Sequence, residues 1–139
     1  MIPTHFFFEV TIPASTEEKI PYEKKLFLSY GVITGMEIVI PTGHAGTAHL
    51  QLFYHEFQLY PLSRGENYHG DNAETSFTDR FFLDSAPYEL KARGWNSDIE
   101  HPHAFLVGIE ILLPEQIGML TGTTGLDDLQ EIVGLEIGG

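Results

Sequence analysis

The stretch from Gly31 to Pro61 constrains the fold more than any other part of the sequence. In its first ten residues the side chains alternate with a period of two, which belongs to a β-strand and not to a helix of period 3.6. Pro41 ends this run, and the two glycines in the segment Thr42 to Gly46 let the chain reverse. Alternation resumes from Thr47 to Tyr54 and, after a second reversal, from Phe57 to Tyr60. The stretch therefore predicts two or three successive antiparallel strands.

Five further segments are predicted to be strands, because each is rich in β-branched or aromatic residues or alternates apolar with polar positions. They span residues 5–12, 22–30, 74–83, 88–93 and 103–113. Between them lie a long polar loop at 62–72 and a predicted turn at 94–98. Proline cannot donate a hydrogen bond to a sheet, and six prolines fall at the predicted strand boundaries: Pro13, Pro41, Pro61, Pro87, Pro102 and Pro114.

Eight or nine short strands separated by proline and glycine turns, with no long internal helix, predict an all-β protein. We expect an antiparallel β-sandwich of jelly-roll or Greek-key type over residues 1–114, with an immunoglobulin-like sandwich as the alternative. Trp95 argues against that alternative, because it lies in the predicted turn and not in a central strand. Strict alternation divides the strand after Gly31 into two faces, formed by Val32, Thr34, Met36, Ile38 and Ile40 and by Ile33, Gly35, Glu37 and Val39.

Residues 115–139 differ in character and are predicted to form a Gly-rich linker and a C-terminal arm. Leu126, Leu129, Ile132 and Val133 share one face of a predicted helix of about two turns, with Thr124 as its N-cap. A helix this short is not stable alone in water. Its apolar stripe is therefore predicted to bind a partner surface, either on its own domain or on a neighbouring subunit.

The balance of charges excludes several classes of partner. Seven Lys and Arg oppose 20 Asp and Glu, so the formal net charge of -13 repels phosphate backbones and anionic membrane surfaces. We therefore expect neither nucleic acid nor a membrane as a partner. The sequence has no Cys, which excludes disulfides, thiolate catalysis and Cys-ligated metal sites, and it predicts no cofactor. The segment Met1 to Phe8 shows no recognisable export signal, so synthesis in the cytoplasm is expected.

Histidines form the main metal-binding candidate. His101 and His103 stand two positions apart, so on a strand their imidazoles share one face and could chelate a metal, with His49 or His55 as a third ligand. With a preceding Gly and the later Glu110, this His-x-His resembles the cupin pattern, which implies a metal-dependent enzyme. The spacing departs from that pattern, and a second cupin motif would need a His after His103, where none occurs. The alternative is that both imidazoles bond backbone or water at a strand entrance.

Two other groups of side chains could bind ligands. Four side chains near Gly70 carry oxygen atoms of the kind that calcium prefers: Asp71, Asn72, Glu74 and Asp79. The EF-hand spacing is absent, and a solvated acidic loop is the alternative. A sugar could stack on a platform at the loop end of the sandwich, formed by Trp95, Asn96, Tyr68 and His69. The sequence contains no nucleophile elbow, phosphate-binding loop or dinucleotide fingerprint, and we predict no catalytic residues.

Several segments give the chain a rhythm of strands and turns: IPYEKKL, GVITGMEIVIPTGHAG, QLYP, PYELKARGWN and PHAFLVGIEILLP. This rhythm resembles the small single jelly rolls of viral capsid, cement and decoration proteins. The likeness covers about Phe6 to Pro114 and includes no diagnostic motif. It implies a subunit that works through its surfaces as a symmetric oligomer, with extended termini that lie on neighbouring subunits.

We therefore expect a non-enzymatic structural or assembly protein, such as a phage capsid decoration or capsid-associated subunit in a virion or another extracellular assembly. Its partners would be further copies of itself, as a trimer or higher oligomer, and other structural proteins. A cupin-like metal-dependent enzyme and a carbohydrate-binding sandwich module are the alternatives.

Overall fold

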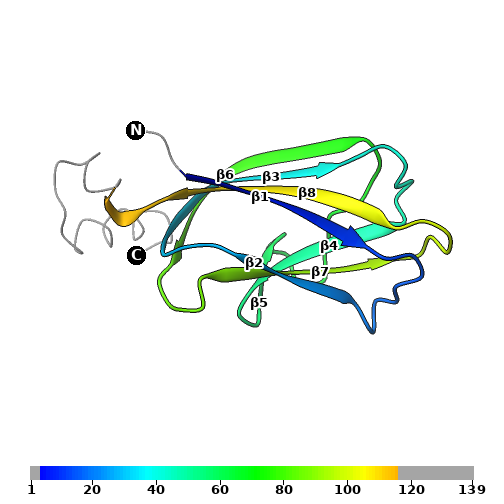
Figure 1. The fold of residues 1–139 in the computed structure, drawn as a ribbon, viewed down its shortest axis with the longest axis horizontal. Coiled ribbons are helices and arrows are strands. Elements are labelled where there is room, and N and C mark those ends of the chain that lie inside the picture. The colour runs from blue at the N-terminus through cyan, green and yellow to red at the C-terminus, as the bar shows by residue number, and fades with distance from the viewer. Residues whose placement is uncertain (1–3, 116–139) are drawn as a thin grey trace.

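A computed structural model describes residues 4–115 of the 139-residue chain. Over this range the chain forms two four-stranded antiparallel sheets that pack face to face (Figure 1). Sheet A has the strand order β1-β8-β3-β6 and sheet B the order β2-β7-β4-β5. The strands are β1 (Thr4–Ile12), β2 (Tyr22–Phe27), β3 (Gly31–Ile40), β4 (Ala48–Tyr54), β5 (Phe57–Tyr60), β6 (Ala73–Leu83), β7 (Glu89–Asn96) and β8 (His103–Leu112). The predicted all-β antiparallel sandwich is confirmed.

The strands pair as a series of nested hairpins. β4 pairs with β5, β3 with β6, β2 with β7 and β1 with β8, all antiparallel. This long ribbon folds across itself, so that β8 also pairs with β3 and β7 with β4. Wrapping of nested pairs into two packed sheets of four strands is the jelly-roll arrangement. The more specific of the two predicted topologies is therefore confirmed.

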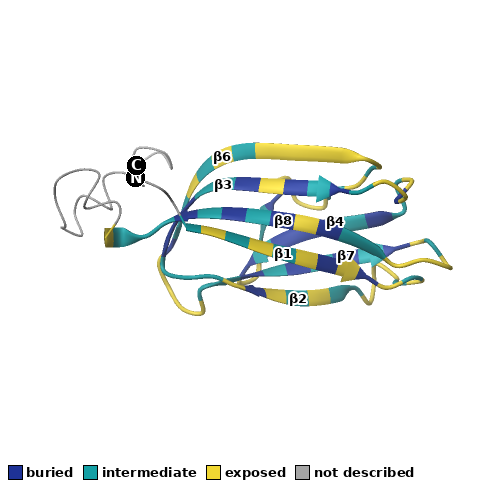
Figure 2. Ribbon diagram, turned by 45° about the horizontal axis from the view of Figure 1, so that its top comes forward, coloured by how far each residue is buried: buried dark blue, intermediate teal, exposed yellow. Residues whose placement is uncertain are grey.

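The hydrophobic core lies between the two sheets, and alternation along each strand decides which side chains enter it (Figure 2). In β1, Val10 and Ile12 are fully buried, whereas Phe7, which lies on the other face of the strand, is 74% exposed. Leu50 and Leu52 of β4 are buried from the opposite sheet. Burial of these apolar surfaces is the main favourable contribution to folding. The two inward faces therefore form one continuous core.

Strand β3 does not alternate strictly. Its register shifts between Ile33 and Gly35 relative to both neighbouring strands, which marks a β-bulge. As a result Ile33 and Met36 both belong to the main core, whereas Val32 is buried in a separate small cluster. The prediction that Val32 and Met36 share a face is wrong, because one inserted residue moves the side chains before it to the opposite face.

The turn predicted at 94–98 is also misplaced, because β7 continues to Asn96. Gly94 therefore lies inside a central strand of sheet B, where it pairs with both neighbours. The side chain of Ile12 from sheet A occupies the space that a side chain at Gly94 would need. A Cβ atom there would also lie 2.7 Å from the carbonyl oxygen of His49. Glycine at this position allows the two sheets to approach each other closely.

Polar contacts join the two sheets at both edges of the sandwich. At one edge, Nζ of Lys24 in β2 donates to the carbonyl oxygen of Glu9 in β1 at 2.7 Å. At the other edge, the hydroxyl of Tyr60 in β5 donates to Oδ2 of Asp79 in β6 at 2.5 Å. Burial, and then the Asp79 carboxylate, raise the pKa of Tyr60, so its phenol stays protonated. Each long side of the core is thus closed by a hydrogen bond.

The predicted linker and arm from residue 116 onward lie outside the described residues, including Thr124 and the stripe of Leu126, Leu129, Ile132 and Val133. Within residues 4–115, no helix has the length and hydropathy needed to cross a membrane.

Replacing Gly94 by Ala is expected to destabilise the sandwich by about 1–3 kcal/mol, the usual cost of forcing extra atoms into a packed core. The backbone oxygen of His49 cannot rotate away from the new methyl group, so the strands must move. Urea denaturation followed by far-UV circular dichroism measures the change. Gly35→Ala is the matched control, because a Cβ atom there meets its nearest neighbour, Cβ of Glu110, at 3.4 Å. Equal losses in the two variants would contradict this account of Gly94.

Candidate functional site

Two of the predicted ligand-binding residues, Trp95 and His69, lie together on the outer face of sheet B. Trp95 of β7 lies directly opposite His49 of β4, and the two rings stack with centroids 5.2 Å apart and an interplanar angle of 14°. The ring of His69 follows, 5.1 Å from that of His49. The Nδ1 atoms of both histidines lie 2.8 Å from Oδ1 of Asn67, which can only accept, so each imidazole donates from Nδ1. The three rings form a row across the sheet.

The other two predicted ligand-binding residues, Asn96 and Tyr68, serve the fold instead. Asn96 is fully buried, and its Nδ2 donates to the carbonyl oxygens of Ile12 at 3.3 Å and His101 at 3.0 Å. Tyr68 forms a β-bridge with Leu50 and packs against the main core, where burial raises the pKa of its hydroxyl. The predicted four-residue platform is therefore corrected to Trp95 and His69. Alternation places Asn96 inward because it lies in a strand and not in a turn.

The histidines of the predicted metal site do not converge. His101 and His103 both approach Asp98, with Nε2 of His103 at 2.8 Å and Nδ1 of His101 at 3.7 Å from its Oδ2. His49 lies on the outer face of sheet B, and His55 lies in the turn after β4. Over residues 4–115, no three His, Asp or Glu side chains are grouped so that they could hold a metal ion. His101 and His103 therefore share a carboxylate, that of Asp98, as their common neighbour.

The side chains of the predicted calcium site are also spread apart. Oδ1 of Asp71 accepts the backbone N–H groups of Ala45 at 2.9 Å and Gly43 at 2.8 Å. These two hydrogen bonds lower the pKa of Asp71. Asp79 instead accepts from Tyr60 at the edge of the sandwich. Asp71 therefore fixes the turn between β3 and β4.

Strand alternation does not reveal a buried histidine, His44, in that same turn. His44 is 2% exposed, and its Nε2 donates to the carbonyl oxygen of Ala104 at 2.8 Å while its Nδ1 has no hydrogen-bond partner. Its ring centroid lies 4.7 Å from that of His103 and 4.9 Å from that of Phe105. Burial has the largest effect and lowers the pKa of His44, against the opposing hydrogen bond to Ala104. His44 is therefore a neutral core residue near neutral pH.

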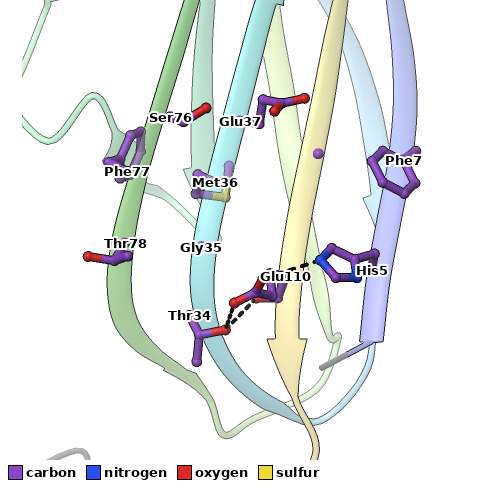
Figure 3. Close-up of a pocket in the computed structure, with 11 residues that line it drawn as sticks. His5, Phe7, Thr34, Gly35, Met36, Glu37, Ser76, Phe77, Thr78 and Glu110 are labelled. Atoms are coloured by element: carbon purple, nitrogen blue, oxygen red, sulfur yellow. Dashed lines mark hydrogen bonds and ion pairs between the residues drawn. The ribbon is translucent and has the colours of Figure 1, made fainter. Parts of the chain in front are cut away.

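The outer face of sheet A has a hollow of about 490 Å³ (Figure 3). Gly108 of β8 has no side chain to fill it, and the ring of Phe7 from β1 lies over Gly108. The carboxylate of Glu110 lies 3.2 Å from Nε2 of His5. Together with Glu37, it gives the hollow an acidic lining.

The outer face of sheet B has a groove of about 560 Å³ beside Trp95. Strands β7 and β4 contribute Arg93 and Phe53 to its base, with the guanidinium carbon 5.7 Å from the centre of the Phe53 ring. Two apolar side chains along the groove are exposed, Phe57 by 75% and Leu62 by 76%. Nε of Arg93 is buried without a hydrogen-bond partner. The groove thus combines exposed apolar side chains with an incompletely satisfied cation.

Gln58 builds the wall of this groove that carries Leu62. Its Nε2 lies 2.7 to 3.1 Å from the carbonyl oxygens of Pro61, Ser63 and Glu66. Its Oε1 accepts the backbone N–H of Gly65 at 3.0 Å. One side chain thereby holds most of the loop 61–66 against the sheet. The wall is therefore held in place by hydrogen bonds. The sequence around Gly65 has no apolar periodicity that would have indicated it.

Comparison with known proteins assigns no family to the chain. No protein-family profile matches it, and no curated protein matches it either. Among solved structures, one similar chain comes from Bacillus endospore appendages, which form a family of disulfide-linked pili. That chain is 14% identical, the match covers 80% of this chain and 90% of that chain, and the TM-score is 0.39. This likeness carries no functional argument, and the present sequence has no Cys for disulfides.

We expect the free energy of unfolding to fall as the pH is lowered from about 7 to about 5. His44 has a lowered pKa in the folded protein, whereas in the unfolded chain a histidine titrates near pH ~6.5. The unfolded state therefore binds more protons in this range, and acid favours it. His44→Gln retains a donor for the Ala104 carbonyl but cannot titrate. Urea denaturation at the two pH values should show a smaller acid loss in this variant than in the wild type.

A second loss of stability belongs to a lower pH range and provides the control. The N–H of Glu100, and then the hydrogen bond with His103, lower the pKa of Asp98 to about 2. Stability from this carboxylate is lost only as the pH falls below the normal range of an Asp towards 2. His44→Gln should leave that loss unchanged. An acid loss between pH 7 and 5 that is equal in wild type and variant would contradict the assigned role of His44.

Proposed function

We propose that this chain is a non-catalytic structural subunit that assembles, through its outer surfaces, with further copies of itself and with other structural proteins. The observation that carries the proposal is a set of large apolar side chains left outside a complete core. Each is at least 67% exposed: Phe7, Ile20, Phe27, Phe57, Leu62 and Ile99.

The arrangement of these side chains supports the proposal further. Phe57 and Leu62 line one groove together with the partly buried Phe53 and Trp95, so apolar surface is gathered there and not scattered. Gathered apolar surface on a soluble domain marks a site of interaction with another macromolecule. The core gains nothing from these residues, because it is already closed by buried side chains from both sheets.

The sequence of the arm supports the same proposal independently. Four apolar residues recur at helical spacing between 126 and 133, in a segment too short to be a stable helix on its own. Such a stripe becomes stable when it is buried against a partner. An arm of this kind fits a subunit that is connected to its neighbours by its termini.

For the setting we propose a virion, in which the chain serves as a phage capsid decoration or capsid-associated subunit, as a trimer or higher oligomer. This part of the proposal is supported by the resemblance to small single jelly rolls of viral capsid, cement and decoration proteins. The jelly-roll topology is compatible with that role, but one fold can carry many functions. The resemblance therefore supports the setting, whereas the exposed apolar surface supports assembly as such.

Deleting residues 116–139 is expected to leave the sandwich folded but to dissociate the oligomer into monomers. All eight strands lie before residue 113, so the two sheets are retained. Size-exclusion chromatography with light scattering gives the mass, and far-UV circular dichroism with thermal denaturation checks the fold. An unchanged oligomeric mass after the deletion would contradict the role of the arm. A full-length chain that stays monomeric at every concentration would contradict the proposed function itself.

A further inference from the structure

The cationic side chains of the chain are segregated between its two faces. Arg80 is the one Lys or Arg in the four strands of sheet A, and the other six lie in sheet B or its flanking loops: Lys19, Lys24, Lys25, Arg64, Lys91 and Arg93. The strands of sheet B carry two carboxylates, Glu23 and Glu89, against four cations. Every strand of sheet A carries a carboxylate that is exposed or partly exposed: Glu9, Glu37, Glu74 and Glu110. An acidic ligand is therefore repelled by sheet A and has its best electrostatic match on sheet B.

The cations of sheet B are incompletely neutralised within residues 4–115. Lys25 and Lys91 lie directly opposite each other, an arrangement that destabilises a sheet unless negative charge is close by. Lys91 has one ion pair, with Glu23 at 3.5 Å. Arg93, two positions further along β7, forms no ion pair in this part of the chain, and its Nε has no hydrogen-bond partner. Arg93 as a whole is only partly buried, so a carboxylate of a partner can neutralise its charge from the solvent side, whereas its buried Nε stays out of reach.

The groove beside Arg93 requires an occupant that is apolar as well as acidic. Phe57 and Leu62 expose about three-quarters of their surface along it. Its two acidic residues, Glu18 and Glu56, are themselves exposed, and neither forms an ion pair with a described residue. The occupant must therefore bring apolar side chains to the groove and carboxylates to its arginines.

One segment of the chain has this composition. Residues 126–136, with the sequence LDDLQEIVGLE, contain the apolar stripe of Leu126, Leu129, Ile132 and Val133. The same eleven positions contain four acidic residues and no Lys, Arg or His: Asp127, Asp128, Glu131 and Glu136. A short amphipathic helix that lays its apolar face into a groove is a common mode of peptide recognition. The ten residues 116–125 that precede the segment can span roughly 33 Å when extended, about the length of a ten-residue strand such as β8, so the segment need not stay beside residue 115.

We infer that the groove of Phe53, Phe57, Leu62, Arg93 and Trp95 receives residues 126–136 of a second copy of this chain. The apolar stripe packs on Phe57 and Leu62, and the carboxylates lie beside Arg93 and the neighbouring Arg64. The inference rests on the proposed function, because it names the surface that receives the arm. The contact joins two different surfaces, so it closes either by reciprocal exchange of arms in a two-fold pair or head-to-tail in rings and filaments.

Full-length variants test the groove directly. Replacing Phe57 and Leu62 together by Ser is expected to weaken self-association about tenfold or more, measured as a Kd from light scattering over a range of concentrations. Both side chains are largely exposed, so the fold should be unaffected, and circular dichroism checks this. Leu106→Ser is the matched control, because Leu106 is an apolar side chain that is 40% exposed on β8 of sheet A and does not line the groove. Its Kd should stay within about twofold of wild type.

A charge-reversal pair tests which groups meet. Arg64→Glu places a third carboxylate along the groove and is expected to weaken association by about threefold or more. Combining it with Asp127→Lys and Asp128→Lys in the same chain is expected to restore the Kd. Rescue requires that the two regions contact each other across the interface. If Arg64 only supported the fold, charge reversal at Asp127 and Asp128 would not restore the Kd.

The outcomes separate the inference from the proposed function. Self-association that is equally tight in wild type and in the Phe57/Leu62 variant overturns the inference and leaves the proposed function standing. A full-length chain that does not self-associate overturns both. A hit on a glycan array that Trp95→Ala abolishes, with self-association unchanged in the Phe57/Leu62 variant, would assign the groove to a sugar and overturn the inference.

Discussion

The contact between Ile12 of sheet A and Gly94 of sheet B joins the two sheets at one corner of the sandwich. The packing of both sheets and the position of the surface groove depend on it. Ile12 ends β1, is fully buried, and fills the space left by the missing side chain of Gly94 in the opposite sheet. Its carbonyl oxygen also accepts a hydrogen bond from Asn96, two residues further along β7. Thr16 then bridges to Asn96 as the chain leaves sheet A for sheet B. Packing and hydrogen bonding therefore act at the same place.

This corner also fixes the position of Trp95. Because Gly94 and Asn96 are both held inward, alternation forces the residue between them to the outer face of sheet B. There it stacks on His49 and lies beside Arg93 in the groove. A constraint inside the core thus sets the geometry of a surface that we propose to be functional. The side chain of Trp95 faces outward because its two neighbours in the strand, Gly94 and Asn96, face inward.

Period-two alternation and proline punctuation predict nearly all of the fold. All eight strands were expected within a few residues of their bounds, because each has its own apolar face. The bulge in β3 was not predictable, since it depends on pairing with β6 and β8 and leaves no local signal at Thr34. The extension of β7 was missed for a similar reason. Gly94 reads locally as a turn residue, and only the approach of Ile12 from the other sheet explains why it lies in a strand.

The candidate sites were less predictable, because they depend on which faces meet in three dimensions. His101 and His103 do lie close together, but the sequence alone could not show that both approach Asp98 or that His49 lies on the outer face of sheet B beside Trp95. The loop from 61 to 66 illustrates the same difficulty. Its shape comes from hydrogen bonds to one glutamine, Gln58, whose role no spacing rule predicts. Charge segregation is visible only once the strands are assigned to sheets.

The nested pairing of the strands has a consequence for how the chain is made. β8 lies between β1 and β3, and β7 lies between β2 and β4, so the first two strands to be synthesised gain in-sheet neighbours only from the last two. β3 can pair with β6, and β4 with β5, well before translation reaches residue 112. Until then β1 and β2 present unpaired edges and apolar faces to solvent, and such edges promote aggregation. Release of an incomplete nascent chain would therefore yield an incomplete sandwich in which β1 and β2 are unpaired and prone to aggregate. A cell has to bind such a chain with chaperones or degrade it.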